Sequence, residues 1–174
     1  PHAELGDLTI ASDGEAIVGL WIEGQKYFAG KVAGNLQRRD GLPVFAQVRA
    51  WLDRYFAGER PEAPTTNEFA LAPSGSTFLQ LVWQVLLEIP YGELVTYGDI
   101  ALTLEERTGT RASARAVGGA VGDNPVSIII TCHRVVGAGG NLTGYGGGLD
   151  KKLRLLELEG VDTAALHLTQ AQRK

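Results

Sequence analysis

The hydrophobic pattern of the chain changes at a connector rich in proline and threonine, and this change limits the possible folds. The connector, residues 59–76 (ERPEAPTTNEFALAPSGS), contains three prolines and two adjacent threonines. Before it, short apolar runs alternate with turn residues, whereas after it apolar residues recur at helical spacing. We therefore predict an α/β (α+β) fold with an N-terminal domain plus connector at residues 1–74 and a C-terminal domain at residues 75–174.

The N-terminal part predicts a small antiparallel sheet with one helix. Residues 8–12 (LTIAS) and 16–24 (AIVGLWIEG) are β-branched and aromatic runs separated by Asp13-Gly14, which is a hairpin signal. Residues 44–58 repeat apolar side chains every four positions and end at Gly58, which is typical of an amphipathic helix. A further short strand is expected inside the connector, at residues 69–71.

The C-terminal part predicts several helices. Ser76 is a candidate N-cap for a helix over residues 77–89, which stops before Pro90. A second helix is expected from about Tyr97 and a third from about Ala112 to residues 123–125, separated by a polar turn at Gly109. This is the layout of a helix-turn-helix unit, here of winged type, in the domain that also carries the one cysteine.

The third of these helices has almost no side-chain bulk. Its small residues are Ala112, Ala114, Ala116, Gly118, Gly119 and Ala120. Each glycine inside a helix costs about 0.5–1 kcal/mol relative to alanine. Such a helix needs close approach, either to another helix or to a DNA groove, and the residues alone favour tight internal packing.

Composition and charge narrow the function classes. The net charge of −4 argues against a protein covered in basic surface, but residues 107–154 carry seven basic and two acidic residues, which leaves −9 for the rest. Such a segment is either a local phosphate-binding face or a chance cluster on the surface. No run of about 18 apolar residues and no signal-peptide pattern occurs, so we expect an intracellular, cytoplasmic protein without a membrane partner.

Cys132 is the only cysteine, so no internal disulfide is possible, and with three histidines at no ligand spacing we predict no metal and no cofactor. A cysteine after an apolar run is either a buried small hydrophobe or a nucleophile. The run at residues 127–130 is predicted to be an apolar strand that ends in polar groups, and the polar neighbours His133 and Arg134 favour a pocket wall. Since adjacent residues of an extended chain point to opposite sides, His133 is expected to reach the thiol through a water. A carboxylate is needed to orient it, and Glu157 and Glu159 are both candidates.

The segment that follows, residues 137–148, holds seven glycines among twelve residues. It is either a plain surface loop or a wall of bare backbone around a flat ligand, with Tyr145 as the ring that faces the ligand.

Four stretches together resemble the O6-alkylguanine-DNA alkyltransferases: IPYGELVTYGDIA, ARAVGGAVGDNP, TCHRVVG and LTGYGGGLDKKLRLLELEG. The resemblance covers residues 76–160 in the family's order, and the N-terminal part matches more loosely. It implies DNA repair by direct reversal. The alkyl group of O6-alkylguanine in double-stranded DNA passes irreversibly to Cys132 after the base is flipped out. Acceptance of O4-alkylthymine stays open.

The resemblance also implies roles for single residues. The reaction would use Cys132 as nucleophile, His133 as base through water, Glu159 as its orienting carboxylate, Asn124 as a hinge, and Tyr97 to rotate the nucleotide and donate to the departing guanine. DNA contacts would come from Tyr97, from Arg115 as the finger that enters the base stack, and from Ala116, Gly118 and Gly119 in the minor groove. The alkylguanine pocket would be lined by Val135 through its carbonyl and by Tyr145, Gly146 and Lys152.

Two positions depart from the family pattern. Thr131 stands where proline is usual, and Gly146 stands where some members have serine. Because the nucleophile and base are retained, we expect activity. The metal site of some relatives needs N-terminal Cys and His ligands, for which this chain offers only His2.

Two other functions compete with alkyl transfer. A non-catalytic alkyl-lesion binding protein, as in the alkyltransferase-like proteins, would lack the cysteine that is present here. A thiol hydrolase would place its base far from the cysteine in sequence rather than next to it. We expect a monomer on DNA and leave cooperativity open.

Overall fold

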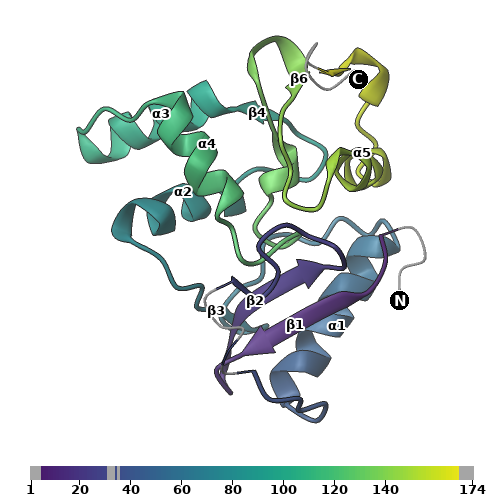
Figure 1. The fold of residues 1–174 in the computed structure, drawn as a ribbon. Helices are drawn as coiled ribbons and strands as arrows, with labels where there is room; N and C mark the ends of the chain where they lie inside the picture. The colour runs from purple at the N-terminus through teal and green to yellow at the C-terminus, as the bar shows by residue number, and fades with distance from the viewer. Residues whose placement is uncertain (1–4, 31–33, 35, 169–174) are drawn as a thin grey trace.

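The computed structural model describes residues 5–30, 34 and 36–168 (Figure 1). Its N-terminal part contains β1 (Leu8–Ser12), β2 (Ala16–Ile22), α1 (Pro43–Phe56) and β3 (Ala70–Leu71). The hairpin prediction is confirmed, since β1 and β2 pair antiparallel and Asp13 Oδ1 accepts hydrogen bonds from the N–H groups of Glu15 and Ala16. The sheet is not wholly antiparallel, however. β3 pairs with β2 in parallel because the chain crosses over through α1 before it returns.

The predicted amphipathic helix is present as α1, which ends at Phe56. Its buried side chains are Val44, Val48, Trp51, Leu52 and Tyr55. They belong to the same hydrophobic cluster as the sheet residues Ile17, Leu20 and Ile22. The helix therefore covers the sheet with the stripe that the four-residue spacing predicts.

The C-terminal part is built around three helices, α2 (Thr77–Leu87), α3 (Tyr97–Thr108) and α4 (Ala114–Gly122). Ser76 caps α2 as predicted, because its Oγ accepts from the Leu79 N–H. Helix α3 begins at Tyr97 with a capping box between Thr96 and Asp99, and Gly109 ends it with φ of 69°. Helix α4 begins two residues later than predicted, since Ser113 supplies the cap to the Ala116 N–H.

Short elements and one more helix complete the C-terminal part. They are β4 (Val95–Thr96), the 3-10 turn η2 (Cys132–Arg134), β5 (Val135–Val136), η3 (Ala138–Gly140), β6 (Asn141–Leu142), α5 (Leu149–Leu158), η4 (Thr163–Ala165) and β7 (His167–Leu168). β4 pairs with β5 and β6 with β7, both in parallel. Among the described residues, no helix has the length and apolar character needed to cross a membrane.

The apolar run before the cysteine, residues 127–130, is not the strand that its composition suggests. Ile128 has φ of 72°, and the Ile130 N–H donates to the Val126 carbonyl at 3.0 Å, so the chain folds back on itself. Asn124 causes this path. Its Oδ1 accepts from the Val126 N–H at 2.9 Å, while its Nδ2 donates to the Ile130 carbonyl at 2.8 Å. The isoleucines are buried as loop side chains in the core rather than as a ladder.

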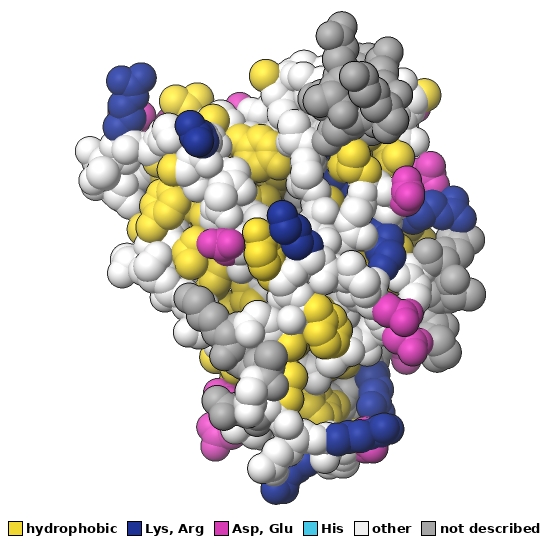
Figure 2. Space-filling view, in the orientation of Figure 1, with side chains coloured by type: hydrophobic (Ala, Val, Ile, Leu, Met, Phe, Trp, Pro, Cys, Tyr) yellow, Lys and Arg dark blue, Asp and Glu magenta, His cyan; other side chains and the backbone are white. Residues whose placement is uncertain are grey.

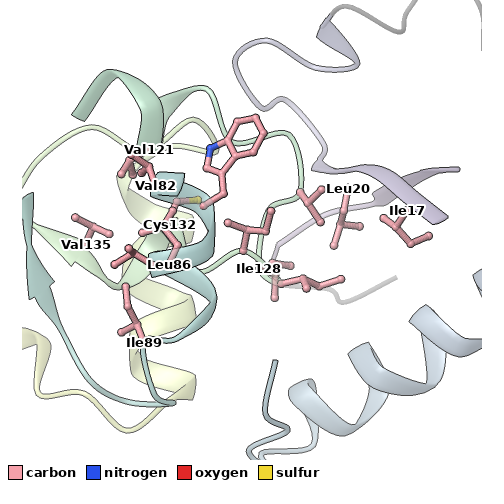
Figure 3. Close-up of a cluster of buried hydrophobic side chains, with 14 of the residues drawn as sticks. Ile17, Leu20, Val82, Leu86, Ile89, Val121, Ile128, Cys132 and Val135 are labelled. Atoms are coloured by element: carbon pink, nitrogen blue, oxygen red, sulfur yellow. The ribbon is translucent and has the colours of Figure 1, made fainter. Parts of the chain in front are cut away.

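The two parts of the chain share one hydrophobic core (Figure 3). Ile17 and Leu20 of β2 lie in the same cluster as Leu86 of α2 and Ile128. The backbone of Leu20 also donates to the Pro125 carbonyl at 2.9 Å and accepts from the Ser127 N–H at 2.8 Å. The segment that leads to the cysteine is therefore held by the N-terminal sheet.

Candidate active site

Cys132 is the first residue of η2 and is 7% exposed. Asn124 Nδ2 donates to its Sγ at 3.1 Å, with the same amide that shapes the preceding loop. Burial raises the pKa of the Cys132 thiol, and the Asn124 hydrogen bond and the nearby Lys152 charge lower it by less. The thiol is therefore favoured over the thiolate, and a base is needed to generate the nucleophile.

His133 is fully buried and lies beside a carboxylate. Its Nε2 is 2.7 Å from Glu159 Oε1, while Nδ1 has no hydrogen-bond partner among the described residues. Glu157 is not the orienting carboxylate, because it pairs with Arg154 at the surface. Burial lowers the pKa of His133, which favours the neutral ring. With the proton on Nε2, Nδ1 is left as an acceptor.

The relation between His133 and Cys132 has a different origin from the predicted one. Both residues lie in a 3-10 turn rather than in an extended strand, so their side chains diverge by about 120°. No hydrogen bond joins the two side chains in the described structure, and the relay through water stays a prediction.

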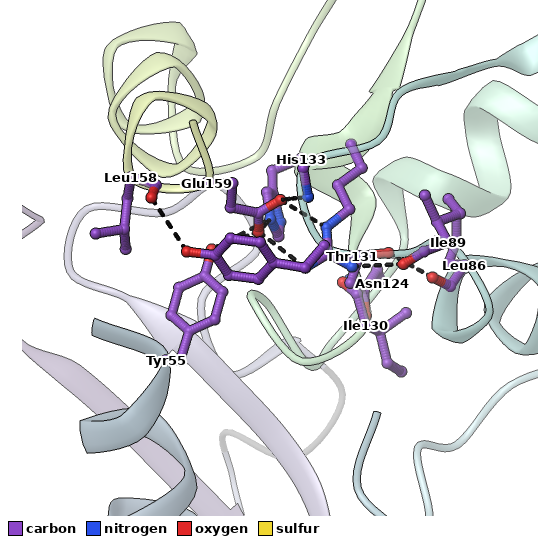
Figure 4. A network of polar contacts seen from close by, with 12 residues as sticks. Tyr55, Leu86, Ile89, Asn124, Ile130, Thr131, His133, Leu158 and Glu159 are labelled. Carbon is purple, nitrogen blue, oxygen red and sulfur yellow. Dashed lines mark hydrogen bonds and ion pairs between the residues drawn. The ribbon is translucent and has the colours of Figure 1, made fainter. Parts of the chain in front are cut away.

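Glu159 follows α5 and accepts five hydrogen bonds (Figure 4). Two come from Arg134, with Nε 2.8 Å from Oε2 and Nη2 2.9 Å from Oε1. The others come from His133, from the Gly92 N–H at 3.0 Å, and from the Tyr55 hydroxyl at 2.7 Å. Burial raises the pKa of Glu159, but the hydrogen bonds and charges of His133 and Arg134 outweigh this and hold the pKa well below its usual range. The sequence reasoning missed Arg134, Gly92 and Tyr55 as partners, and Tyr55 lies 104 positions away.

Lys152 of α5 is completely buried. Its Nζ donates to the Val135 carbonyl at 2.5 Å and to the Thr143 carbonyl at 3.3 Å. Burial lowers the pKa of Lys152 to about 8. The Val135 carbonyl, which is predicted to line the alkylguanine pocket, is thus already bonded to Lys152. One acceptor lone pair remains on this oxygen.

A small cavity of about 20 Å³ adjoins the sulfur. Its walls are Gln25, Val121, Gly122, Asn124, Ser127, Cys132, Gly144, Tyr145 and Gly146. The Tyr145 hydroxyl is buried without a hydrogen-bond partner in the described structure. A Cβ at Gly146 would meet Gln25 at 3.6 Å, which is an ordinary contact, so the position does not require glycine for want of space at Cβ. The sequence reasoning missed Gln25, which reaches the site from the N-terminal part and accepts from Ser127 Oγ at 2.8 Å.

A larger hollow of about 1110 Å³ lies elsewhere, along β1 and α1, and none of the predicted site residues lines it. Within the described ranges, His, Cys, Asp and Glu side chains form no group of three or more that could hold a metal ion. His2 lies outside these ranges.

Helix α4 reaches the cavity with its C-terminal end, where Val121 and Gly122 are wall residues, whereas Tyr97 is not one of the walls. The Tyr97 hydroxyl accepts from Thr143 Oγ1 at 3.1 Å, and a Cβ at Gly118 would lie 3.7 Å from the Tyr97 ring. A Cβ at Gly119 would meet nothing within 4 Å. Internal packing, which the composition favoured, therefore does not explain these glycines.

The outer surface of α4 is exposed and nearly bare. Ala114, Arg115, Ala116 and Gly119 are all exposed. Lys and Arg side chains are scattered over the face shown in Figure 2 rather than gathered in one patch.

Thr131 occupies the position where the family usually has proline, and the structure shows how the threonine is accommodated. Its φ of −78° is one that proline adopts, and its N–H makes no hydrogen bond among the described residues. Its hydroxyl donates to the Leu86 carbonyl at the end of α2. The threonine thus keeps a φ that proline also adopts, and its hydroxyl adds a hydrogen bond to α2.

Comparisons with known proteins agree over both parts of the chain. Residues 77–161 match the family model "6-O-methylguanine DNA methyltransferase, DNA binding domain", and residues 2–65 match "6-O-methylguanine DNA methyltransferase, ribonuclease-like domain". The methylated-DNA--protein-cysteine methyltransferase of Haemophilus influenzae is 46% identical over 157 residues, or 90% of this chain and 82% of that protein. The protein of the same name from Mycobacterium leprae is 46% identical over 157 residues, with 89% and 87% covered.

A solved structure is also similar. The crystal structure of Mycobacterium tuberculosis OGT in complex with DNA aligns with a TM-score of 0.75 at 39% identity, over 94% of this chain and 90% of that one. From its sequence, its fold and the buried Cys132–His133–Glu159 arrangement, the chain belongs to the 6-O-methylguanine DNA methyltransferase family.

Proposed function

We propose that this protein repairs DNA by transferring the alkyl group of O6-alkylguanine to Cys132 in a single, irreversible turnover. The observation that carries the proposal is a buried thiol that accepts a hydrogen bond from Asn124, next to a histidine whose Nε2 is bonded to Glu159. Relatives that carry the name methylated-DNA--protein-cysteine methyltransferase support it. The lesion is proposed to lie in double-stranded DNA, and the protein to act as a cytoplasmic monomer.

The proposed reaction balances as a simple displacement. The Cys132 thiol gives its proton to His133 Nδ1 through a bridging water, which suits a thiol whose pKa is raised by burial. Sulfur then attacks the alkyl carbon, and the S–C bond forms as the C–O6 bond breaks. The guanine leaves with the electron pair and takes up a proton donated by the Tyr97 hydroxyl, and Tyr97 regains a proton from His133 through water. Overall the thiol hydrogen is exchanged for the alkyl group, and the thioether has no easy leaving path.

The other residues are proposed to hold the extruded base and the DNA. Tyr145, Gly146, Lys152 and the Val135 carbonyl would line the base pocket, which must widen because the present cavity is only about 20 Å³. Arg115 would fill the place of the base in the stack. Ala116, Gly118 and Gly119 would lie against the minor groove, where large side chains would hold α4 away.

Intact-mass measurement tests the proposal. A duplex oligonucleotide with one O6-methylguanine should increase the mass of the protein by one methylene, and peptide mapping should place it on Cys132. The Cys132→Ser variant and an undamaged duplex are the controls. An unmodified protein that still binds the lesion would favour the non-catalytic lesion binder, and repeated turnover would favour a hydrolase.

A further inference from the structure

Tyr55 is, among the residues that the structure describes, the one member of the Glu159 network that comes from the N-terminal part of the chain (Figure 4). It lies in the last turn of α1 and is completely buried. Its ring stacks on Trp51 with centroids 5.6 Å apart, and it meets Phe56 and Tyr91 edge-on at 5.2 and 5.8 Å. These rings hold the hydroxyl in one place, 2.7 Å from Glu159 Oε1.

The protonation states of Tyr55 and Glu159 determine which of the two groups donates the hydrogen bond. Burial and the Glu159 charge raise the pKa of Tyr55 well above its usual range, so the phenol stays protonated. The pKa of Glu159 is depressed, so the carboxylate is charged. The Tyr55 O–H therefore donates to Oε1, the same oxygen that His133 Nε2 contacts at 2.7 Å, and it lies 3.4 Å from that nitrogen.

With Tyr55 in place, the carboxylate is saturated. Oε1 accepts from Tyr55, His133 and Arg134, while Oε2 accepts from Arg134 and Gly92. A carboxylate offers about four lone-pair sites, so five donors leave no free direction. Such a carboxylate cannot rotate, and its charge is shared among several donors. It can orient the imidazole without pulling a second proton onto it.

We propose that Tyr55 is a positioning residue for alkyl transfer: its hydroxyl fixes the Glu159 carboxylate so that His133 keeps its proton on Nε2 and presents Nδ1 as the base. The inference rests on the proposed function, since it assigns Tyr55 a part in that reaction. It gives the N-terminal part of the chain a direct role in the chemistry, through α1.

In the Tyr55→Phe variant described below, the other charged and titratable groups around the pair are unchanged. They are Arg134 and Cys132 of η2, Lys152 of α5, Tyr145 of the glycine-rich loop, and Tyr91 with Arg60 over its ring. Removal of one donor leaves the Glu159 charge less shared, so the protonated form of His133 gains stability. On acidification, His133 is therefore protonated, and stops acting as the base, at a higher pH than in the wild type.

The Tyr55→Phe variant tests this, because it deletes only the hydroxyl. Single-turnover alkyl transfer from an O6-methylguanine duplex is followed from about pH 5 to about pH 9. The acidic limb of the rate profile should move up by about half a pH unit to one unit, with a rate about three- to tenfold lower on that limb and a similar plateau at high pH. The matched control is Tyr91→Phe, whose hydroxyl donates to the Leu158 carbonyl rather than to Glu159.

A structural role for Tyr55 gives a different result. Equal rate losses for both variants at every pH, or a Tyr55→Phe profile that coincides with the wild type, would overturn the proposal. If Tyr55→Phe does not fold, 3-fluorotyrosine at position 55 keeps the ring and makes the hydroxyl a stronger donor, and the limb should then move to lower pH. An unshifted limb would again overturn the proposal. A wild-type protein that transfers no alkyl group would instead refute the proposed function.

Discussion

Lys152 and Glu159 are buried charges of opposite sign near the Cys132–His133 turn, and they are held in different ways. Among the described residues, Glu159 has five hydrogen-bond donors, whereas Lys152 donates to two carbonyls. A buried ammonium with few partners gives up its proton readily, whereas a buried carboxylate with several donors keeps its charge. Lys152 is charged at neutral pH at a cost to stability, and Glu159 is charged at little cost.

The cost of Lys152 predicts an unusual pH dependence. Its pKa is about 8 in the folded protein and near 10.5 when unfolded, so between these values the unfolded chain binds one proton more. Stability from this group therefore rises with pH across that window. The free energy of unfolding of the wild type minus that of Lys152→Met should rise by about 3 kcal/mol between about pH 8 and pH 10.5.

Urea unfolding at a series of pH values measures this difference. Lys151→Met is the matched control, since the Lys151 ammonium bonds to the Glu23 carbonyl at an exposed contact. It removes one lysine charge of the same kind without changing a buried site. A flat or falling difference for Lys152→Met would contradict the assigned pKa.

Single residues were predicted from sequence only where a motif marks them. Resemblance selected Glu159 over Glu157, and the geometry of the structure agrees with that choice. Tyr55 and Gln25 carry no such mark. Each reaches the site across a large sequence separation, and a core tyrosine near the end of an amphipathic helix is indistinguishable from ordinary packing until the fold is known.

Among the elements, helix α4 departs most from ordinary helix composition. Val117, Ala120 and Val121 bury one side, and the other side is open. Gly119 has helical backbone and free space around it, so helix propensity alone predicts that Gly119→Ala stabilises the protein by about 0.5–1 kcal/mol. A bulkier Gly119→Leu should also fold, but should weaken binding to an O6-methylguanine duplex about tenfold, because the side chain would separate the helix from the groove.

Thermal unfolding and fluorescence-anisotropy titration of both variants check this, with the inert Cys132→Ser background used for binding. Gly119→Ala serves as the control for folding and for loss of the glycine itself. Wild-type affinity in Gly119→Leu would show that α4 does not approach DNA. Destabilisation by Gly119→Ala would show that the space around it is not free.

Elements with local signals were predicted well. The Ser76 cap, the hairpin at Asp13-Gly14 and the helix from Tyr97 are each specified by neighbouring residues, and each is present. The run at residues 127–130 was predicted wrongly, because its β-branched composition is typical of a strand. The Asn124 side chain bonds both the Val126 N–H and the Ile130 carbonyl, and this tertiary constraint overrides the local preference.

At the level of the whole molecule, α4 has different surroundings at its two ends, since Val121 and Gly122 near its C-terminal end line the cavity beside Cys132. Arg115 is exposed on α4 and does not line the cavity beside Cys132. The division at residues 74/75 stays a prediction, and the shared core means that the N-terminal sheet supports the active-site loop directly. A defect in DNA handling should therefore be separable from a defect in chemistry.

Arg115→Ala provides that separation. Base extrusion costs a few kcal/mol, and a side chain that fills the vacated place supplies part of it. Loss of about 1.4–2.8 kcal/mol would slow transfer from duplex DNA about ten- to hundredfold. The rate with free O6-benzylguanine should stay unchanged, because no base must leave a stack and no contact at the sulfur is altered.

The matched control is Arg111→Ala, which removes one exposed arginine just ahead of α4. If Arg115 acts only through its charge, both variants should lose duplex reactivity equally, and raised salt should reduce the wild type in the same way. If it fills the stack, only Arg115→Ala should show the large loss. Equal slowing of Arg115→Ala on the free base and on the duplex would mean that the substitution reaches the sulfur through the fold, which the exposure of Arg115 and its absence from the cavity wall argue against.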